Sequence, residues 1–516
     1  MVRADQLKAI ETAKEPWDIV IIGGGASGLG AALDGASRGH KTLLLEKSDF
    51  AQGTSSKSTK LIHGGVRYLK QGSIRLVFQA LKERGFLLKN PPHLVHKMSF
   101  IIPVYSWWRL LFYGVGLILY DLLAGKKRIE STIFLSRKKT QTLLPNLKDN
   151  RLVGGIAYWD AQFNDTRLAI SLARSAVAYG ATVINYCSVM SIVKEEGRIC
   201  GVLGKDNING KEYKIDAKVV LNATGVFSNH IRKMDQPDIK SNIVPSQGTH
   251  IVLDRKFLLG NHAILIPKTS DGRVLFSIPW HNKLLVGTTD YLVDSIDNNP
   301  TPFSEEIDYI LKIIGEYLKE QPTRNDILSV FSGLRPLVAR KNDKTKDISR
   351  NHSMVVSQSG LISLTGGKWT TYRKMAEDAI DVVQSVGGIE NHRCKTAEIK
   401  FDGFDSSITN ENPLHMYGCF SKDILTIDSS TGNSSLGKNF YLTPNQILWG
   451  IREEMAIRLE DILARRSRCL FLDAKETIEI APRVTKIMVD ELGHDQRWID
   501  KELRDFKRAA EKYIMN

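Results

Sequence analysis

The chain has 516 residues, 42% hydrophobic and 25% charged, which is typical of a globular protein too long for one core and predicts two or three domains. Its 71 Lys and Arg against 57 Asp and Glu give a formal net charge of +14, which favours an anionic partner such as a phosphorylated substrate or an acidic membrane face. The 5 cysteines are scattered without CxxC or metal-ligand spacing, so we expect neither a disulfide framework nor a metal site.

The N-terminal segment has no apolar core of signal-peptide length, so we do not expect export. The first predicted element is a buried strand, a glycine turn and a helix of small residues, WDIVIIGGGASGLGAALDGASRG, residues 17–39. Gly23, Gly25 and Gly28 form G-x-G-x-x-G there, which lets the backbone approach a pyrophosphate at a helix N-terminus. Glu46 closes the next strand, where a carboxylate can bind a ribose diol and would repel a 2′-phosphate. This pattern predicts a dinucleotide site but does not separate NAD from FAD.

A Ser/Thr/Gly-rich segment then leads into KLIHGGVRYLKQG, residues 60–72, which we place at the start of a helix. Its paired glycines let the backbone approach a flat or bulky group, while His63 and Arg67 supply a titratable group and an anion grip. Further along, residues 110–125 read LLFYGVGLILYDLLAG, and their apolar run ends at Asp121, about half of the ~20 residues that a spanning helix needs. We therefore expect a buried or interfacial helix that does not span a membrane.

The later segments alternate between helix, strand and turn patterns. Residues 165–184 have the periodicity of a helix followed by a glycine turn and a strand. Four strand patterns between residues 248 and 290 have turn residues between them, which predicts an antiparallel sheet. Two further turns favour FAD: VVLNATG, ending at Gly225, is suited to backing onto adenine and pyrophosphate, and LTGGKWTT, residues 364–371, is suited to placing a helix N-terminus beside the flavin N1/O2 edge. From residue 389 the pattern is that of a small helical domain.

These segments together carry a family resemblance. The matching motifs, in order between residues 17 and 378, are DIVIIGGGASGLG, TSSKSTKLIHGGVRYL, VLNATG, VGTTD, SGLRPL and TGGKWTTYRKMAED. The chain resembles the FAD-dependent glycerol-3-phosphate dehydrogenases, the respiratory enzymes also called the aerobic type. The resemblance implies an enzyme that uses FAD to oxidise sn-glycerol 3-phosphate to dihydroxyacetone phosphate and passes the electrons to a membrane quinone.

The expected fold is α/β (α+β overall) in three parts. A discontinuous, Rossmann-like FAD-binding domain of the D-amino-acid-oxidase/glutathione-reductase type is expected from residues 1–103, about 150–244 and 351–388. An antiparallel-sheet substrate-binding or cap domain is expected from about 104–149 and 245–350. A helical C-terminal domain is expected from 389–516.

The resemblance also implies the site residues. A phosphate needs fixed cations, and arginine offers it a bidentate fork; the expected substrate-binding residues are Arg67, Tyr68, Arg335, Arg350 and Lys368. The expected catalytic residues are His63, His250, Arg335 and Lys368, with the two histidines as alternative bases for the C2 hydroxyl because imidazole titrates near neutral pH. His63 has a second possible role against the flavin ring, and Lys368 could instead stabilise charge on the flavin. The expected cofactor-binding residues are Gly23, Gly25, Gly28, Glu46, Thr54, Ser55, Ser58, Lys60, Leu61, His63, Gly225, Gly366, Gly367, Lys368 and Thr370.

Three alternatives remain open from the sequence. An oxidase of the same family, which would pass electrons to O₂ and release peroxide, shares all these motifs. An amine- or hydroxy-acid-oxidising relative would need a carboxylate clamp, and the arginines of HGGVRY and SGLRPL argue against it. A non-enzymatic nucleotide- or nucleic-acid-binding protein has no supporting motif, so we expect no nucleic-acid partner. The charge and the apolar segment favour peripheral attachment to the cytoplasmic face of an inner membrane, and a homodimer is possible.

Overall fold

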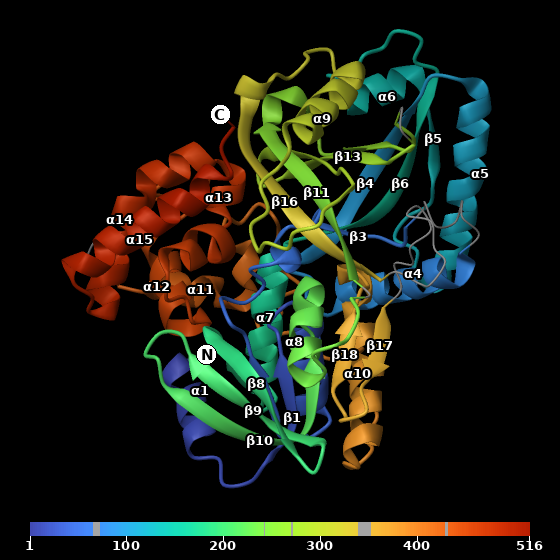
Figure 1. The fold of residues 1–516 in the computed structure, drawn as a ribbon. Helices are drawn as coiled ribbons and strands as arrows, with labels where there is room; N and C mark the ends of the chain where they lie inside the picture. The colour runs from blue at the N-terminus through green and yellow to red at the C-terminus, as the bar shows by residue number, and fades with distance from the viewer. Residues whose placement is uncertain (66–72, 242, 270–271, 339–351, 429–431, 516) are drawn as a thin grey trace.

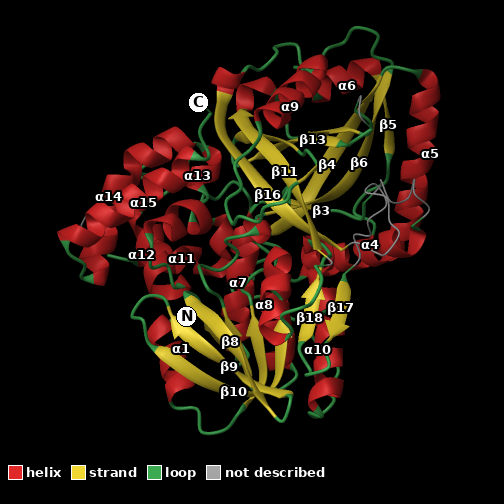
Figure 2. Ribbon diagram, in the orientation of Figure 1, coloured by secondary structure: helices red, strands yellow, loops and turns green. Residues whose placement is uncertain are grey.

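The computed structural model describes residues 1–65, 73–241, 243–269, 272–338, 352–428 and 432–515. Two β-sheets lie one beyond the other along the molecule, and the helices of the C-terminal part pack beside their junction (Figure 1). Figure 2 shows that helices cover both sheets. The architecture confirms the predicted α/β class with a helical C-terminal region.

The first sheet has a parallel centre. Among the described residues it has 8 strands, with the main order β17-β18-β10-β1-β2-β7 and with β8 and β9 extending from β10. The bounds are β1 Trp17–Ile22, β2 Thr42–Leu45, β7 Thr182–Ile184, β8 Cys187–Glu195, β9 Arg198–Asp206, β10 Glu212–Asn222, β17 Ser353–Val356 and β18 Ile362–Thr365. β1 pairs in parallel with both β10 and β2, so the turns that follow β1 and β10 meet at one edge of the sheet. That edge is where open α/β sheets bind ligands.

Helices cover this sheet on both faces. They are α1 Arg3–Glu11, α2 Ala26–Ser37, α7 Asp165–Ala178, α8 Ser228–Asp235 and α10 Tyr372–Gly387. α2 consists largely of small residues because it packs closely against α10: a Cβ on Gly30 would lie 2.8 Å from Cδ2 of Tyr372. This packing fixes the helix whose N-terminus follows the glycine turn.

The second sheet is almost entirely antiparallel, as predicted. Among the described residues it has 10 strands, with the main order β15-β11-β14-β13-β12-β4-β6-β3, and β16 and β5 pair with β11 and β6. The bounds are β3 Leu61–Ile62, β4 Val95–Val104, β5 Ile133–Ser136, β6 Gly154–Phe163, β11 Ile243–Asp254, β12 Ala263–Ile266, β13 Leu275–Trp280, β14 Lys283–Gly287, β15 Tyr291–Leu292 and β16 Ile327–Val338. β12 and β4 form the one parallel pair within the described part of this sheet.

The strands β3, β4 and β6 belong to this second sheet, whereas we expected residues 1–103 and 150–244 to lie in the FAD-binding domain. The boundaries expected at 103 and 150 therefore do not separate the two sheets. β4 is buried on both faces: Phe100 and Ile102 lie in one hydrophobic core and Ile101 in another.

The remaining helices cover the second sheet or form the C-terminal part. Those against the second sheet are α4 Ile74–Lys89, α5 Trp107–Ala124, α6 Arg137–Leu143 and α9 Ser304–Tyr317. Those of the C-terminal part are α11 Ser421–Thr426, α12 Pro444–Glu454, α13 Cys469–Leu472, α14 Ala474–Leu492 and α15 Gln496–Glu511. α12 starts with a capping box between Thr443 and Gln446 and has proline in its first turn. Residues of this part contribute to the cores under both sheets, so it holds the two together.

Candidate active site

A cavity of about 590 Å³ opens at the edge of the first sheet where β1, β10 and β18 end. Its wall includes the following sequence-predicted cofactor residues: Gly23, Gly25, Glu46, Thr54, Ser55, Gly225, Gly366, Gly367 and Lys368. Segments that are hundreds of residues apart in the chain therefore meet around one space. A cofactor long enough to contact all these segments fits the cavity better than a compact ligand does.

The glycine turn after β1 requires its glycines for two different reasons. Gly23 has φ +109°, a backbone conformation that side chains disfavour. A Cβ on Gly28 would lie 1.9 Å from the carbonyl oxygen of Gly23, so Gly28 permits the helix to pack on the turn and does not line the cavity. Gly25 lines the cavity at the start of α2, whose first N–H, from Ala26, donates to Ser55 Oγ at 3.0 Å. The turn thus aims a helix N-terminus, with its positive dipole end, at the cavity.

Glu46 is held rigidly at the cavity wall. Its carboxylate accepts the backbone N–H of Gly24 at 2.6 Å and that of Ser48 at 2.9 Å. Burial raises the pKa of Glu46 above its ordinary value, and the two N–H donors oppose that shift. The fixed carboxylate keeps further lone pairs for hydroxyl donors in the cavity.

The turn after β18 forms the opposite wall. Gly366 and Gly367 have φ +83° and +77°, and a Cβ on Gly367 would lie 2.2 Å from Sδ of Met375. This turn presents Lys368 and Trp369, the first residue of the short helix Trp369–Thr371, to the cavity, and Trp369 Nε1 donates to the carbonyl of Ser55 at 2.9 Å. Ser55 therefore forms hydrogen bonds with both glycine turns, one on each wall of the cavity.

Several predicted cofactor residues lie behind the wall and not on it. Lys60 is fully buried, and its Nζ donates to Asp165 at 2.6 Å and to the carbonyl of Ser56 at 2.7 Å. Ser58 Oγ donates to the same carboxylate at 2.8 Å. Leu61 pairs with Gln162 in the second sheet. These residues support the chain that lines the cavity.

His63 lies where this chain meets both the second glycine turn and the second sheet. Its backbone N–H and carbonyl both bond to Thr370 Oγ1, at 3.3 and 3.4 Å, and its ring centroid is 6.3 Å from that of Phe276. The N–H of the next residue, Gly64, donates to the Tyr120 hydroxyl at 2.8 Å, and a Cβ there would lie 2.5 Å from that hydroxyl. The absence of a side chain at Gly64 thus admits Tyr120 of α5, whereas we expected it to admit the cofactor.

His250 is buried in β11, with its imidazole stacked on Phe331 at 5.0 Å between ring centroids. Its Nε2 is 3.0 Å from Thr59 Oγ1, and its buried Nδ1 has no hydrogen-bond partner among the described residues. Burial, followed by the charges of Lys60 and Arg335, holds the pKa of His250 well below its ordinary value. The imidazole is therefore neutral, which is the form that can accept a proton.

Arg335 lies on β16 beside Pro336, which lines the cavity. Its guanidinium donates to Thr288 Oγ1 at 2.9 Å and to Asp290 at 3.3 Å. A Cβ on Gly248 would lie 2.2 Å from Nη2, so the arginine occupies its position only because residue 248 is glycine. The neighbouring Leu334 carbonyl accepts the hydroxyl of Thr54 at 2.6 Å, which links this strand to the cavity wall.

The expected substrate residues Arg67, Tyr68 and Arg350 lie outside the described residues. Of the four expected catalytic residues, Lys368 lines the cavity, whereas His63, His250 and Arg335 do not line it and lie on neighbouring segments. The sequence did not single out Trp369, Asp165 or Tyr120. Trp369 follows the Gly366–Gly367 turn by two residues, so that motif could have identified it. Asp165 and Tyr120 act through contacts with distant segments, which the sequence does not reveal.

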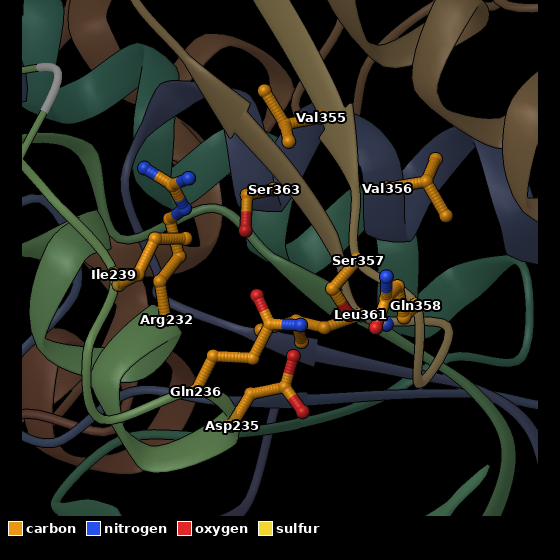
Figure 3. Close-up of a pocket in the computed structure, with 10 residues that line it drawn as sticks. All are labelled: Arg232, Asp235, Gln236, Ile239, Val355, Val356, Ser357, Gln358, Leu361 and Ser363. Atoms are coloured by element: carbon orange, nitrogen blue, oxygen red, sulfur yellow. Dashed lines mark hydrogen bonds between the residues drawn. The ribbon is translucent and has the colours of Figure 1, made fainter.

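A second, smaller cavity of about 270 Å³ lies between α8 and the β17–β18 hairpin (Figure 3). Asp235 in its wall is engaged by Lys194 at 2.7 Å and by the hydroxyl of Ser359 at 2.5 Å. None of the sequence-predicted site residues lines it. The larger cavity is therefore the candidate active site.

Comparison with known families agrees with this geometry. Residues 18–373 match the family described as FAD dependent oxidoreductase, and residues 357–498 match the C-terminal domain of alpha-glycerophosphate oxidase. The first match covers most of the chain, so the protein is an FAD-dependent oxidoreductase with FAD as its cofactor.

Individual relatives narrow the family. The chain is 37% identical to mitochondrial glycerol-3-phosphate dehydrogenase of Bos taurus over 99% of this chain and 75% of that protein. It is also 37% identical to the SDP6 mitochondrial glycerol-3-phosphate dehydrogenase of Arabidopsis thaliana, over 97% of this chain and 87% of that one. The chain belongs to the FAD-dependent glycerol-3-phosphate dehydrogenase family, and it is an enzyme of that class.

Solved structures are consistent with this family. The glycerol-3-phosphate dehydrogenase from Bacillus halodurans complexed with FAD has a TM-score of 0.80 and 27% identity, covering 100% of this chain and 98% of that one. The L-alpha-glycerophosphate oxidase from Mycoplasma pneumoniae with FAD bound has a TM-score of 0.56 and 19% identity, covering 74% of this chain and 97% of that one. The second likeness shows the shared fold alone.

The residues around the larger cavity fit FAD. The glycine turn aims the start of α2 into the cavity, which suits a pyrophosphate, and Glu46 stands where a ribose can donate to it. Gly225 has φ +57°, and a Cβ there would meet no atom within 4 Å, so the space beside this turn is open. The second glycine turn supplies another short helix N-terminus on the far wall.

Proposed function

We propose that this chain oxidises sn-glycerol 3-phosphate to dihydroxyacetone phosphate and delivers the electrons to a membrane quinone. The observation that carries this proposal is that a neutral buried histidine, His250, and a preoriented arginine, Arg335, lie on the paired strands β11 and β16, and β16 also supplies Pro336 to the cavity wall. Two points support this choice of substrate. The relatives are named glycerol-3-phosphate dehydrogenases, and glycerol 3-phosphate has an oxidisable secondary alcohol beside its phosphate.

The phosphate is proposed to bind cationic side chains near this wall. Arg335 is already fixed by Thr288 and Asp290, so little side-chain entropy is lost when it grips an anion. Lys368 supplies a second positive charge from the opposite turn. Arg67, Tyr68 and Arg350 are proposed to complete the site.

A histidine is proposed to remove the proton from the C2 hydroxyl. The chemistry that bound FAD would supply is a two-electron acceptor for the hydride equivalent of C2. His250 offers a buried imidazole whose Nδ1 has no hydrogen-bond partner among the described residues, and His63 is a half-buried residue whose backbone bonds to Thr370. The proposed cofactor residues hold FAD at Gly23, Gly25, Glu46, Thr54, Ser55, Gly225, Gly366, Gly367, Lys368 and Thr370, while Gly28, Ser58, Lys60, Leu61 and the backbone of His63 support that wall.

Replacing each histidine separately tests these roles. We expect His250→Asn to retain FAD and to slow anaerobic bleaching of the flavin by glycerol 3-phosphate by about 10²–10⁴-fold, the usual loss for a general base. His63→Asn should be slowed comparably only if His63 is the base instead. If neither variant is slowed tenfold, the proposed proton acceptor is wrong.

The membrane part of the proposal comes from α5. Together with the residues up to Lys127 it is 21 residues long with a mean hydropathy of 1.3, so by length and composition alone it is long and apolar enough to cross a membrane. The sequence expectation of a buried or interfacial helix that does not span is not overturned by length and composition alone. Asp121, where the apolar run ends in the sequence, is buried and accepts the backbone N–H of Thr132 at 2.6 Å.

The two faces of α5 support interfacial attachment in preference to spanning. One face is buried on the second sheet through residues such as Leu117 and Tyr120. The outer face is defined here by the large hydrophobic residues of α5 that are more than half exposed: Trp107, Trp108, Leu111, Phe112, Val115 and Leu122. Lys126, Lys127 and Arg128 follow it directly. An apolar face with aromatic residues and adjoining cations is typical of a helix lying in an anionic membrane surface, proposed here to be the cytoplasmic face of the inner membrane.

A vesicle assay tests this attachment. We expect the purified enzyme to co-sediment with phosphatidylglycerol/phosphatidylethanolamine vesicles, and the combined variant Trp108→Ser/Val115→Ser/Leu122→Ser to lose most of that binding. Leu425→Ser is the matched control, because Leu425 is a 56% exposed leucine on α11. Equal binding by the triple variant and the control would contradict the proposed surface.

The oxidase alternative is tested with the same preparation. The match to a glycerophosphate oxidase domain gives this second candidate its specific support. After anaerobic bleaching by substrate, we expect a soluble quinone to restore the flavin absorbance much faster than air does. Fast recovery in air with stoichiometric peroxide would make O₂ the acceptor and the enzyme an oxidase.

A further inference from the structure

A cluster of arginines in the C-terminal part contacts the wall of the FAD cavity from behind. The segment RRSR supplies Arg465 and Arg466, at the end of a π-helix spanning Asp461–Arg466, and Arg468, just before α13. Their exposures are 2%, 1% and 0%. We call these three residues the arginine cluster, and residues 49–60 the wall segment, because Ala51 to Ser55 line the cavity.

The first contact fixes the start of the wall segment. Asp49 accepts Arg465 Nε at 2.5 Å and Arg466 at 2.6 and 3.0 Å. The two arginines, against the opposing effect of burial, hold the pKa of Asp49 at about 2, so this carboxylate is charged at neutral pH. Two residues later, the N–H of Ala51 donates to the carbonyl of Gly24 at 2.9 Å, inside the glycine turn. The C-terminal part is thereby tied to the turn that faces FAD.

The second contact fixes the middle of the wall segment. Arg468 donates to the carbonyl of Ser56 at 2.8 Å and to Thr166 Oγ1 at 2.7 Å, and it lies 3.3 Å from Asp165. Lys60 donates to the same Ser56 carbonyl at 2.7 Å. The carbonyl oxygen of Ser56 thus accepts hydrogen bonds from two buried cationic side chains. One belongs to the C-terminal part and the other to the wall segment itself.

The position of Ser56 decides that of Ser55. Ser55 Oγ accepts the first N–H of α2, and its carbonyl accepts Trp369 Nε1 at 2.9 Å. Apart from the short helix Thr54–Ser56, the wall segment has no helix or strand to hold it, so its conformation depends on such bonds. Moving Ser56 would separate Ser55 from both glycine turns at once.

We propose that the arginine cluster positions the wall segment for FAD, so that cofactor affinity depends on contacts made by the C-terminal part. Among the described residues that line the cavity there is no arginine of the cluster; the three arginines act through Asp49 and Ser56. They are positioning residues for the cofactor. A buried ion pair is seldom more stable than apolar packing of the same volume, so a positioning role accounts for this cluster better than global stability does.

FAD titration of the apoprotein tests the proposal. Arg468→Lys keeps the charge but cannot reach Ser56, Thr166 and Asp165 together. We expect the FAD dissociation constant, from quenching of flavin fluorescence, to rise at least tenfold, while the melting temperature of the apoprotein stays within a few degrees of wild type. The matched control is Arg452→Lys, because Arg452 makes a bidentate pair with Glu491 at 2.7 Å on the surface of the same part. The control should bind FAD as the wild type does.

A second variant keeps the test decisive if Arg468→Lys does not fold. Asp49→Asn is isosteric and removes the charge that Arg465 and Arg466 bind, and we expect it also to weaken FAD binding at least tenfold. The proposal is overturned if the folded variants bind FAD within twofold of wild type, or if FAD loss occurs only at temperatures where the apoprotein itself unfolds. The readout is cofactor binding, so it is independent of the substrate and the electron acceptor.

Discussion

Two buried histidines predict a steep loss of stability in mild acid. His93 lies beneath the C-terminal part, where a Cβ on Gly418 would be 3.0 Å from its ring. His281 lies in the turn after β13, with Nε2 3.2 Å from Asn164 Nδ2 and its ring 6.2 Å from that of His415. Burial, with smaller effects from neighbouring cations and histidines, lowers the pKa of each to about 3.

The direction and size of the effect follow from linkage. The ordinary histidine pKa in the unfolded chain is about 6.5, so between pH 6.5 and pH 3 the unfolded state binds protons that the folded state does not. These histidines therefore contribute stability that is present above pH 6.5 and is lost as the pH falls toward 3. From pH 7 to pH 5 the loss is about 2 kcal/mol for each residue and about 4 kcal/mol for the pair.

Urea unfolding of the FAD-saturated enzyme at pH 7, 6 and 5 measures this loss. His281→Asn combined with His93→Gln should reduce the pH-dependence of the unfolding free energy by about 4 kcal/mol over this range. Asparagine suits position 281 because that residue has φ +46°. His494→Asn, at an exposed histidine, is the control. An unchanged pH-dependence in the double variant would refute the assignment of these two residues.

Three further substitutions have defined outcomes. Gly28→Ala places a Cβ 1.9 Å from the Gly23 carbonyl, so FAD affinity measured by calorimetry should fall at least tenfold; unchanged affinity would contradict the tight turn. Tyr120→Phe leaves the Gly64 N–H without its acceptor, so the unfolding free energy should fall by about 1–3 kcal/mol, and no fall would mean that this bond is not formed. Glu454→Gln breaks the buried pair with Arg167 at 2.6 and 2.7 Å and should cost about 3–5 kcal/mol in urea unfolding, whereas a cost under 1 kcal/mol would contradict a buried pair.

The sequence predicted the two glycine turns, each with the strand before it and the helix after it. Gly23, Gly25 and Gly28 stand within six residues of one another, and their role depends only on one turn and the helix after it. The same holds for Gly366, Gly367 and their strand-to-helix turn. Such motifs can be recognised because the chemistry and the backbone conformation lie in one short segment.

The hydrogen bonds and ion pairs that hold the site in place could not be predicted, because they join segments that are far apart in the sequence. Arg468 bonds to a carbonyl 412 positions away, and Lys60 to a carboxylate 105 positions away. Hydrophobic periodicity carries no information about such partners. Seen alone, RRSR is a run of charge at the end of a helical pattern, and its burial was not evident.

The domain limits and the helix α5 show two further limits of pattern analysis. β4 packs into a hydrophobic core on each of its two faces, and this burial gives no hint in the sequence of which sheet the strand joins. Asp121 ended the apolar run in the sequence, but folding directs it inward to Thr132 and leaves the outer face apolar. In both cases the three-dimensional neighbours decided the outcome.

The central claim is that FAD in the larger cavity is reduced by glycerol 3-phosphate. The most direct measurement mixes the yellow enzyme anaerobically with glycerol 3-phosphate in a stopped-flow instrument and records the flavin absorbance, with glycerol and glycine as comparison substrates. We predict rapid bleaching by glycerol 3-phosphate and at least a hundredfold slower bleaching by glycerol, because Arg335 and its neighbouring cations then have no phosphate to bind. Bleaching by glycine, or equal rates with glycerol and glycerol 3-phosphate, would contradict the phosphate site on which the account depends.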